Sequence, residues 1–265
     1  MAIRERLAKL RRDPGIVADR LYKTVRGTHP ADLKRERDTY AGALRALATI
    51  ASEQGCVRRE RLGDVFEGVA ETSDAVELAE LFAEHGSDKS TTHDHYATYA
   101  GLLSGRRHEQ LLLLEIGVGT NNPMVWSSMG PGGTPGASLR AFRDWAPEAK
   151  VFGADIDSEI LFTEERIATY HVDQTSPDSL ASLAETLRGK QFDLIIDDGL
   201  HSPWANLNTL SFALPLLSPR GAFVVEDVDE AYLSAWEVAA TLLKSEYNCR
   251  LVRGKAKWIF LVQRA

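Results

Sequence analysis

A run of apolar residues at 111–116, interrupted only by Glu115, ends directly in Gly117-Val-Gly119. Such a run is typical of a strand buried on both faces of a parallel sheet, and it restricts the possible folds of this chain more than any other segment. Further candidate strands lie at residues 151–154, 167–172, 192–196 and 222–225. Candidate helices separate them, at residues 138–145, 177–187, 204–216 and 231–244. Strands that alternate with helices in this way predict a doubly wound α/β fold with a mostly parallel sheet.

The end of the chain has a different pattern. Residues 250–252 and 258–262 have the composition of strands and are separated by a short turn that contains Gly254. A parallel return needs a crossover of roughly a dozen residues, so these two strands must be antiparallel. Together with the five earlier strands they predict a seven-stranded sheet with an antiparallel C-terminal hairpin.

Two regions are expected along the 265 residues. In residues 1–85 the apolar residues recur at helical spacing, as at 31–53 and 75–84, and we find no strand pattern before residue 111. Residues 1–85 are therefore predicted to be a helical appendage that serves as a lid or in subunit contacts. Residues 86–265 are predicted to form the catalytic domain.

Composition excludes several classes of protein. The net charge of −7 argues against a dedicated nucleic-acid binder, which needs clustered Lys and Arg to contact phosphates. No apolar run is long enough to span a membrane. Cys56 and Cys249 lie far apart and have no C-x-x-C partner, so neither a disulfide framework nor a zinc site of cysteines is indicated. A cytoplasmic protein is the simplest expectation.

The Gly117-Val-Gly119 turn favours a nucleotide-like cofactor, because glycines let the backbone approach a ligand closely. The dinucleotide fingerprint is not met: Asn122 stands where a third small residue is needed, and Pro135-Gly136 stands where an acidic residue is expected. Asp155, at the end of the second strand, can instead accept the two hydroxyls of a ribose. A cofactor without a diphosphate, such as S-adenosylmethionine, fits this pattern.

A second informative segment is Asp197-Asp198-Gly-Leu-His201, which ends the strand at 192–196, and the next strand ends in Glu226-Asp227. Adjacent parallel strands bring their carboxyl ends to the same edge of a sheet, so Asp198, Glu226 and Asp227 are expected to converge. Converging carboxylates need a cation to neutralise them, and oxygen ligands favour Mg²⁺ or a similar ion. The alternative, that these acids only cap the following helices, stays open.

His201 is the candidate general base, because the pKa of an imidazole lies near neutrality and this one follows Asp198 by three residues. A metal ion held by Asp198 would lower the pKa of a bound hydroxyl, His201 would take its proton, and the oxygen would attack the sulfonium methyl. The catalytic pair expected from the sequence is therefore His201 and Asp198.

These motifs resemble class I S-adenosylmethionine-dependent methyltransferases over residues 86–265. The resemblance implies a Rossmann-like sheet and places Glu115, Gly117 and Gly119 at the methionine part of the cofactor, Asp155 at the ribose, and Asp173 and Gln174 at the adenine. The full set of expected cofactor contacts is Glu115, Gly117, Gly119, Asn122, Asp155, Asp173, Gln174 and Asp197. The segment 121–136, rich in Gly and Pro, is longer than in minimal members and is expected to form a wall of the substrate site.

A narrower resemblance rests on the combination of G-S-D-K, L-E-I-G-V-G, S-L-R, A-D-I-D, D-Q, I-I-D-D-G-x-H and V-E-D. It is similar to the metal-dependent O-methyltransferases that act on deoxysugars in actinomycete natural-product pathways, such as those of mycinamicin and calicheamicin. The resemblance implies Asp198, Glu226 and Asp227 as metal ligands, His201 as base, and places for Asp88, Lys89, Ser138 and Arg140 near the site. It also implies a homo-oligomer.

The acceptor stays open at this point. The long segment 121–136 and a short N-terminal region differ from the macrolide enzymes and favour a smaller acceptor, such as TDP-rhamnose or another nucleotide-linked sugar. A phenol, a catechol or another small hydroxyl compound is the alternative acceptor. A non-catalytic protein that binds S-adenosylmethionine is the alternative outside enzymes, and such a protein would have no need of a base.

Overall fold

The computed structural model describes residues 30–55 and 57–265. Contacts divide the chain into two units between Ile50 and Ala51. Helix α3 (Pro30–Glu53) agrees with the helix expected at 31–53, and the part of the predicted appendage before residue 30 lies outside the described residues. The division at Ile50, instead of at residue 85, reflects that residues 58–85 pack with the sheet.

The second unit is built on one nine-stranded sheet, in the order β1-β8-β9-β7-β6-β2-β3-β5-β4. Seven of its strands correspond to the seven expected from the sequence, and β8 and β9 form the predicted antiparallel hairpin, with Arg250 opposite Leu261. The strands are β1 (Arg58–Arg61), β2 (Leu112–Ile116), β3 (Lys150–Asp155), β4 (Thr163–Glu164), β5 (Ile167–His171), β6 (Phe192–Asp197), β7 (Leu217–Val228), β8 (Tyr247–Arg253) and β9 (Trp258–Arg264).

Two short strands at the edges were not expected. The prediction that no strand precedes residue 111 is wrong: β1 pairs in parallel with β8, with Arg58 opposite Arg250. The sequence of β1 is Arg-Arg-Glu-Arg, which shows no apolar alternation because an edge strand can face solvent and is often charged. The two-residue strand β4 pairs with β5 on the opposite edge and is too short to leave a pattern.

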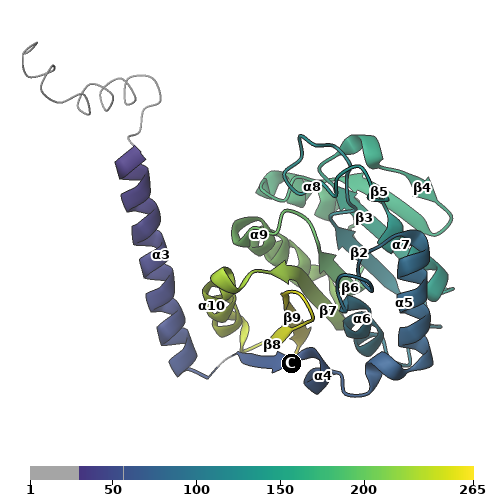
Figure 1. Cartoon of the computed structure of the whole chain (residues 1–265), viewed down its shortest axis with the longest axis horizontal. Helices are drawn as coiled ribbons and strands as arrows, with labels where there is room; N and C mark the ends of the chain where they lie inside the picture. Colours follow the sequence, from purple (N-terminus) through teal and green to yellow (C-terminus); the bar gives the residue numbers. More distant parts are fainter. Residues whose placement is uncertain (1–29, 56) are drawn as a thin grey trace, which may run out of the picture. The chain divides into compact units, whose positions relative to one another are not determined.

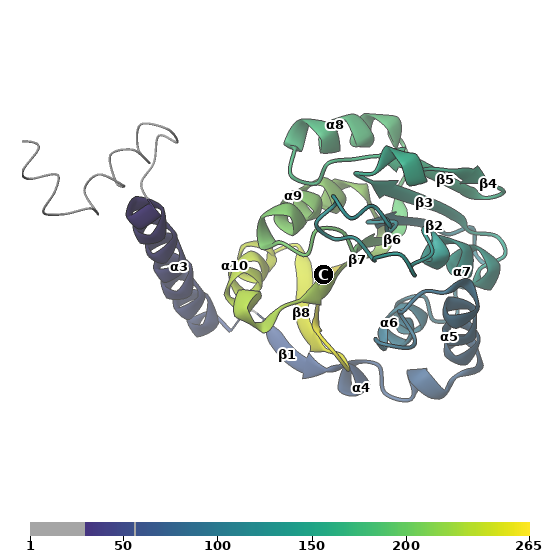
Figure 2. The ribbon, with the colours of Figure 1, turned by 45° about the horizontal axis from the view of Figure 1, so that its top comes forward.

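Helices cover both faces of the sheet and bury two apolar cores (Figures 1 and 2). Helices α5 (Ser73–His85), α6 (His95–Leu102) and α7 (Ala137–Trp145) pack on one face, where the core includes Phe82, Tyr99 and Trp145. Helices α8 (Pro177–Thr186), α9 (Pro203–Ala213) and α10 (Leu233–Leu243) pack on the other, with Trp236 in its core. The remaining short helices are α4 (Leu62–Val65), η1 (Val69–Glu71), η2 (Ser158–Ile160), η3 (Leu214–Leu216) and η4 (Glu230–Tyr232).

Local signals explain where several helices begin and end. Thr72 caps α5 by accepting a hydrogen bond from the backbone N–H of Ala75, and Gly86 closes the helix in the left-handed conformation. Ser176 caps α8 ahead of Pro177. Helix α6 was not predicted because it is buried on most of its surface and so lacks the one-sided apolar pattern that identifies a surface helix.

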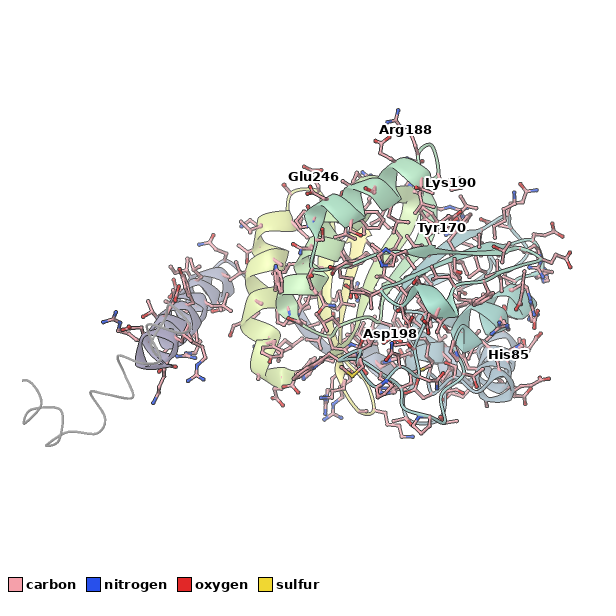
Figure 3. All side chains as sticks on the ribbon, turned by 90° about the horizontal axis from the view of Figure 1, so that it is seen from above. His85, Tyr170, Arg188, Lys190, Asp198 and Glu246 are labelled. Carbon is pink, nitrogen blue, oxygen red and sulfur yellow. The ribbon has the colours of Figure 1, made fainter. Side chains whose placement is uncertain are left out.

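The order of the strands decides where a ligand can bind. Strand β2 pairs with β3 on one side and β6 on the other, so the chain changes direction there and opens a crevice beyond the carboxyl ends of these strands. Figure 3 labels Lys190, just before β6, and Asp198, just after it, at opposite ends of the strand; Asp198 lies among the loops at the carboxyl end. Among the described residues, no helix combines the length and apolarity needed to cross a membrane.

Candidate active site

Two adjoining cavities lie at the carboxyl end of the sheet, one of about 270 Å³ and one of about 510 Å³. They share Gly117, Gly119, Ser127 and Asp198. The smaller cavity, called here the inner cavity, also contacts Asp155, Asp173 and Gln174. The larger one, the outer cavity, contacts Lys89, His93, His201, Glu226 and Asp227. Most of the residues singled out from the sequence therefore meet around one continuous space.

The turn after β2 needs its first glycine. Gly117 has φ of 94°, in the left-handed region, and a Cβ there would collide with the backbone carbonyl of Asp198. The backbones come so close because the N–H of Asp198 donates to the carbonyl of Ile116 at 2.8 Å, while the N–H of Gly117 donates to Ala154 at 2.8 Å. The end of β2 is thus held from both sides, and its turn forms a wall common to both cavities.

Asp155 holds the same turn from β3. Its Oδ2 accepts hydrogen bonds from the backbone N–H groups of Val118 at 2.8 Å and Gly119 at 3.2 Å, and its Oδ1 accepts from Asp157 at 2.9 Å. The residue is buried but contacts the inner cavity. Its carboxylate therefore organises the turn and also faces the space where a ribose is expected.

The structure corrects the assignment of Asp197 to the cofactor. Side chains alternate along a strand, so Asp198 reaches both cavities while Asp197 points into the interior, where it is fully buried. Its Oδ1 accepts from Nε2 of Gln174 at 2.6 Å and from the N–H of Gly199 at 3.3 Å. Burial raises the pKa of Asp197, and these hydrogen bonds oppose that shift. Asp197 thereby positions Gln174 and the loop at Gly199, which do contact the inner cavity.

Asn122 also lies away from both cavities. Its Oδ1 accepts from the backbone N–H of Met124 at 3.0 Å, an Asx turn that starts the segment 121–136. That segment lines both cavities: Met124 and Trp126 contact the inner one, and Met129 and Gly133 contact the outer one.

A buried lysine lies among three of the carboxylates. The ammonium of Lys89 is 2.7 Å from Asp198, 2.6 Å from Glu226 and 3.1 Å from Glu115, and Lys89 is 2% exposed. Burial by itself would lower the pKa of Lys89, but the carboxylates of Asp198, Glu226 and Glu115 outweigh it and raise the pKa well above its ordinary value. Burial raises the pKa of Glu115, against the opposing effects of Lys89 and of the Ser138 hydroxyl, which donates to it.

The three expected metal ligands do not form one equivalent group. Atoms of Asp198, Asp227 and His201 lie within 4.8 Å of one another, a spacing that a metal ion can bridge. Glu226 is held differently: the Tyr99 hydroxyl donates to its Oε1 and Lys89 to its Oε2. Lys89 stands in the G-S-D-K motif and Tyr99 follows His95 by four residues, but spacing alone could not show that these two side chains meet Glu226.

His201 and Asp227 share an unusual backbone conformation, each with φ of 54°. Residues other than glycine rarely adopt this conformation, and it concentrates at functional sites. His201 remains partly exposed, with its Nε2 at 4.0 Å from Oδ1 of Asp198. Both side chains contact the outer cavity. The strained turns thus aim the candidate base and a candidate ligand into the same space.

Two histidines to which the sequence assigned no role face Asp227. Nδ1 of His93 is 3.3 Å and Nε2 of His95 is 3.5 Å from its Oδ1, and their rings stack with centroids 4.6 Å apart. Burial would raise the pKa of Asp227, but His95, His93 and His201 hold it at about 2. Burial would lower the pKa of His95, but Glu226 and Asp227 raise it.

Of the further residues suggested by resemblance, Asp88 and Ser138 contact the outer cavity. Arg140 does not contact either cavity, because its guanidinium pairs with Glu164 at 2.7 Å and lies over the ring of Phe162. Arg140 therefore fastens α7 to the strand β4.

The order of the seven central strands, the glycine turn and the acidic residue that ends β3 together define a class I methyltransferase fold. A family model described as "Methyltransferase domain" matches residues 78–228, more than half of the chain. The chain belongs to this methyltransferase family, which confirms the family expected from the sequence.

Similar proteins include O-methyltransferases of Streptomyces and Micromonospora. The chain is 32% identical over 170 residues to the 8-demethyl-8-alpha-L-rhamnosyl tetracenomycin-C 2'-O-methyltransferase of Streptomyces olivaceus, covering 64% of this chain and 42% of that protein. It is 35% identical over 127 residues to the mycinamicin VI 2''-O-methyltransferase of Micromonospora griseorubida, covering 48% of this chain and 29% of that protein. The chain thus spans less than half the length of these relatives.

The structure is similar to that of the MycE methyltransferase of the mycinamycin pathway, solved in complex with Mg and SAH. The TM-score is 0.57 at 25% identity, and the match covers 71% of this chain and 55% of that chain. The expected doubly wound, Rossmann-like fold is therefore confirmed.

Proposed function

We propose that the protein is an S-adenosylmethionine-dependent O-methyltransferase that acts on a sugar hydroxyl, assisted by a divalent cation. The observation that carries the proposal is that the inner and outer cavities meet at Asp198, with His201 and Asp227 on the outer side and the Gly117 turn between them. One cavity can take the cofactor and the other the acceptor, so that a methyl group crosses at their junction. The names of the sugar O-methyltransferases similar to this chain support the choice of acceptor.

The inner cavity suits the adenosine part of the cofactor. Asp155 would accept the ribose hydroxyls, and Asp173 and Gln174 line the region expected to hold the adenine. Gly117 and Gly119 border both cavities and leave room for the methionine part to reach the outer one. Glu115, expected from the sequence to contact the cofactor, is buried and lines neither cavity; it holds Lys89 and Ser138, which line the outer cavity. When bound, S-adenosylmethionine supplies an electrophilic methyl group on a positively charged sulfur.

Asp198 and Asp227 are the residues best disposed to hold a cation, because their oxygens lie close together with His201 and contact the outer cavity. Oxygen donors suit Mg²⁺, which MycE contains in its solved complex. Glu226 would be the third metal ligand. Hydrogen bonds from Lys89 and Tyr99 hold its carboxylate in place. The cation would hold the acceptor oxygens and lower the pKa of the reacting hydroxyl.

His201 would accept the proton of that hydroxyl. It lies at the open side of the site, 35% exposed, and next to Asp198. As the O–H proton moves to the imidazole, the acceptor oxygen forms a bond to the methyl carbon and the carbon–sulfur bond breaks, which leaves S-adenosylhomocysteine. The protein contributes mainly by aligning oxygen, carbon and sulfur and by neutralising charge.

A nucleotide-linked deoxysugar such as TDP-rhamnose is the proposed acceptor. The segment 121–136 lines the outer cavity with Met129 and Gly133, and it presents Trp126, 92% exposed, and Met124, 88% exposed, at the adjoining inner cavity. Exposed aromatic and thioether groups at a cavity mouth offer a surface for a base or a flat aglycone to stack on.

The protein is also proposed to be a homo-oligomer that uses α3 in subunit contacts. Leu33, Tyr40, Leu47 and Ile50 are exposed on this helix and recur at spacings of seven and three. Light scattering of the full chain would test the oligomeric state, and a monomer at all concentrations would refute it.

The reaction is tested by incubating the full chain with S-adenosylmethionine, Mg²⁺ and a panel of nucleotide deoxysugars, macrolide glycosides and catechols, with and without a chelator. We expect S-adenosylhomocysteine and a methylated sugar to form only in the reactions without chelator. If product forms equally well with chelator, the proposed role of the metal is refuted. If product forms only from catechols, the proposed sugar acceptor is refuted. Failure to bind S-adenosylhomocysteine would refute the cofactor assignment.

A further inference from the structure

We propose that His93, His95 and Asp227 form a second cation site, selective for a divalent transition-metal ion of the zinc class, beside the oxygen ligands proposed for Mg²⁺. The three residues offer two imidazole nitrogens and one carboxylate oxygen within 4.8 Å of one another. This site does not depend on the proposed reaction, because an ion can bind there without cofactor or acceptor.

Distances support a tetrahedral ion. Zinc bonds to nitrogen and oxygen are roughly 2.0–2.1 Å long, so two ligands of a tetrahedral zinc lie about 3.3 Å apart. The oxygen of Asp227 is 3.3 Å from Nδ1 of His93 and 3.5 Å from Nε2 of His95. The two histidine ligand atoms lie at most 4.8 Å apart, so about 1.5 Å of movement brings them to 3.3 Å. The rings, which stack at 24°, must also turn so that the lone pair of each nitrogen points at the ion.

The polar atoms at this position are buried and lack hydrogen bonds. Within residues 30–55 and 57–265, neither ring nitrogen of His95, nor Nδ1 of His93, nor Oδ1 of Asp227 has a partner with hydrogen-bond geometry. His95 is 1% and His93 9% exposed. Unsatisfied buried groups are costly, and a shared cation would be bound by the lone pairs of one nitrogen of each imidazole and of Oδ1 of Asp227.

Charge favours a cation in addition to Lys89. The one ammonium of Lys89 pairs with Asp198, Glu226 and Glu115, whereas Asp227 has the imidazoles of His93 and His95 beside it.

The donor set determines which ion is selected. Mg²⁺ prefers oxygen ligands in octahedral geometry, while imidazoles favour zinc and neighbouring transition metals. His93 and Asp227 both contact the outer cavity, so an ion can enter and keep an open position. Asp227 would belong to both sites.

The test is metal binding by the full chain, freed of metal, in excess Mg²⁺. Zinc affinity is measured by calorimetry, and Co²⁺ is used as a probe because a tetrahedral site gives it strong visible absorption. We expect one tightly bound zinc per chain and a tetrahedral Co²⁺ spectrum. His93→Ala should weaken zinc binding at least about tenfold, since even the loss of a group behind a ligand has that effect. His108→Ala, at an exposed histidine outside both cavities, is the matched control and should bind as wild type.

Thermal unfolding without zinc checks that His93→Ala is folded, and His93→Gln replaces it if it is not. Wild-type protein that does not bind zinc in excess Mg²⁺ overturns the proposal. Equal zinc affinity in the wild type and the His93 variant also overturns the proposal. So does zinc binding that Asp198→Asn abolishes and the His93 variant keeps, because the ion would then lie at the site of Asp198.

Discussion

Replacing Lys89 by Met should strongly destabilise the protein, because it removes the one ammonium that faces three carboxylates. Lys89 is 2% exposed and contacts Asp198, Glu226 and Glu115 at 2.6–3.1 Å. Removing one partner from a buried ion pair costs roughly 3–5 kcal/mol. Asp198 is 25% exposed to the outer cavity, where water can replace part of the lost interaction, so the lower part of that range is expected, about 3 kcal/mol.

The loss of stability in Lys89→Met should depend on pH. Without Lys89 the pKa of Glu115, already raised by burial, rises further above its unfolded value. A carboxyl with a raised pKa in the folded state binds more protons folded than unfolded, so stability falls as pH increases through that interval. The deficit of the variant should therefore be largest near neutral pH and smaller near pH 5.

Urea denaturation followed by circular dichroism measures this difference at both pH values. Lys150→Met, at an exposed lysine at the start of β3, is the control and should change stability by less than about 0.5 kcal/mol. A Lys89→Met deficit below about 1 kcal/mol, or one that does not change with pH, would refute the reasoning.

Three further predictions concern the site. Gly117→Ala should lower the affinity for S-adenosylhomocysteine, measured by calorimetry, at least about tenfold, because the new Cβ meets the backbone of Asp198. Gly105→Ala is the control: Gly105 has φ of 70° but open space around it, so this variant should keep the affinity. Equal losses in both variants would mean that backbone strain alone lowers the affinity. His201→Ala should lower kcat by roughly 100- to 10,000-fold with unchanged S-adenosylhomocysteine affinity, and a variant that retains full rate would exclude His201 as the base. The pKa of Asp227, lowered to about 2, gives about 2 kcal/mol of stability that is present above its unfolded pKa and is lost as pH falls towards 2; metal-free Asp227→Asn should lack this part of the acid transition, and identical curves would contradict the ion pairs.

Local patterns in the sequence were enough to predict the seven central strands of the sheet and the residues that lie at its carboxyl end. The apolar run before Gly117 defines β2, and the short turn at Gly254 requires antiparallel strands, since both depend only on burial and chain geometry between neighbours. The positions of Asp155, Asp198 and His201 follow from the rule that parallel strands end at a common edge.

Contacts between distant segments depended on the tertiary structure. Asp197 and Asp198 are neighbours in sequence, yet one is sealed in the interior by Gln174 and the other faces the cavities, because alternate residues of a strand point to opposite sides. Lys89 and Tyr99 reach Glu226 across more than a hundred residues of chain, a distance over which no periodic pattern carries information. By itself the sequence determined that acidic groups gather at the end of the sheet. Only the tertiary structure brought the ammonium of Lys89 among Asp198, Glu226 and Glu115, because these contacts join segments that are distant along the chain.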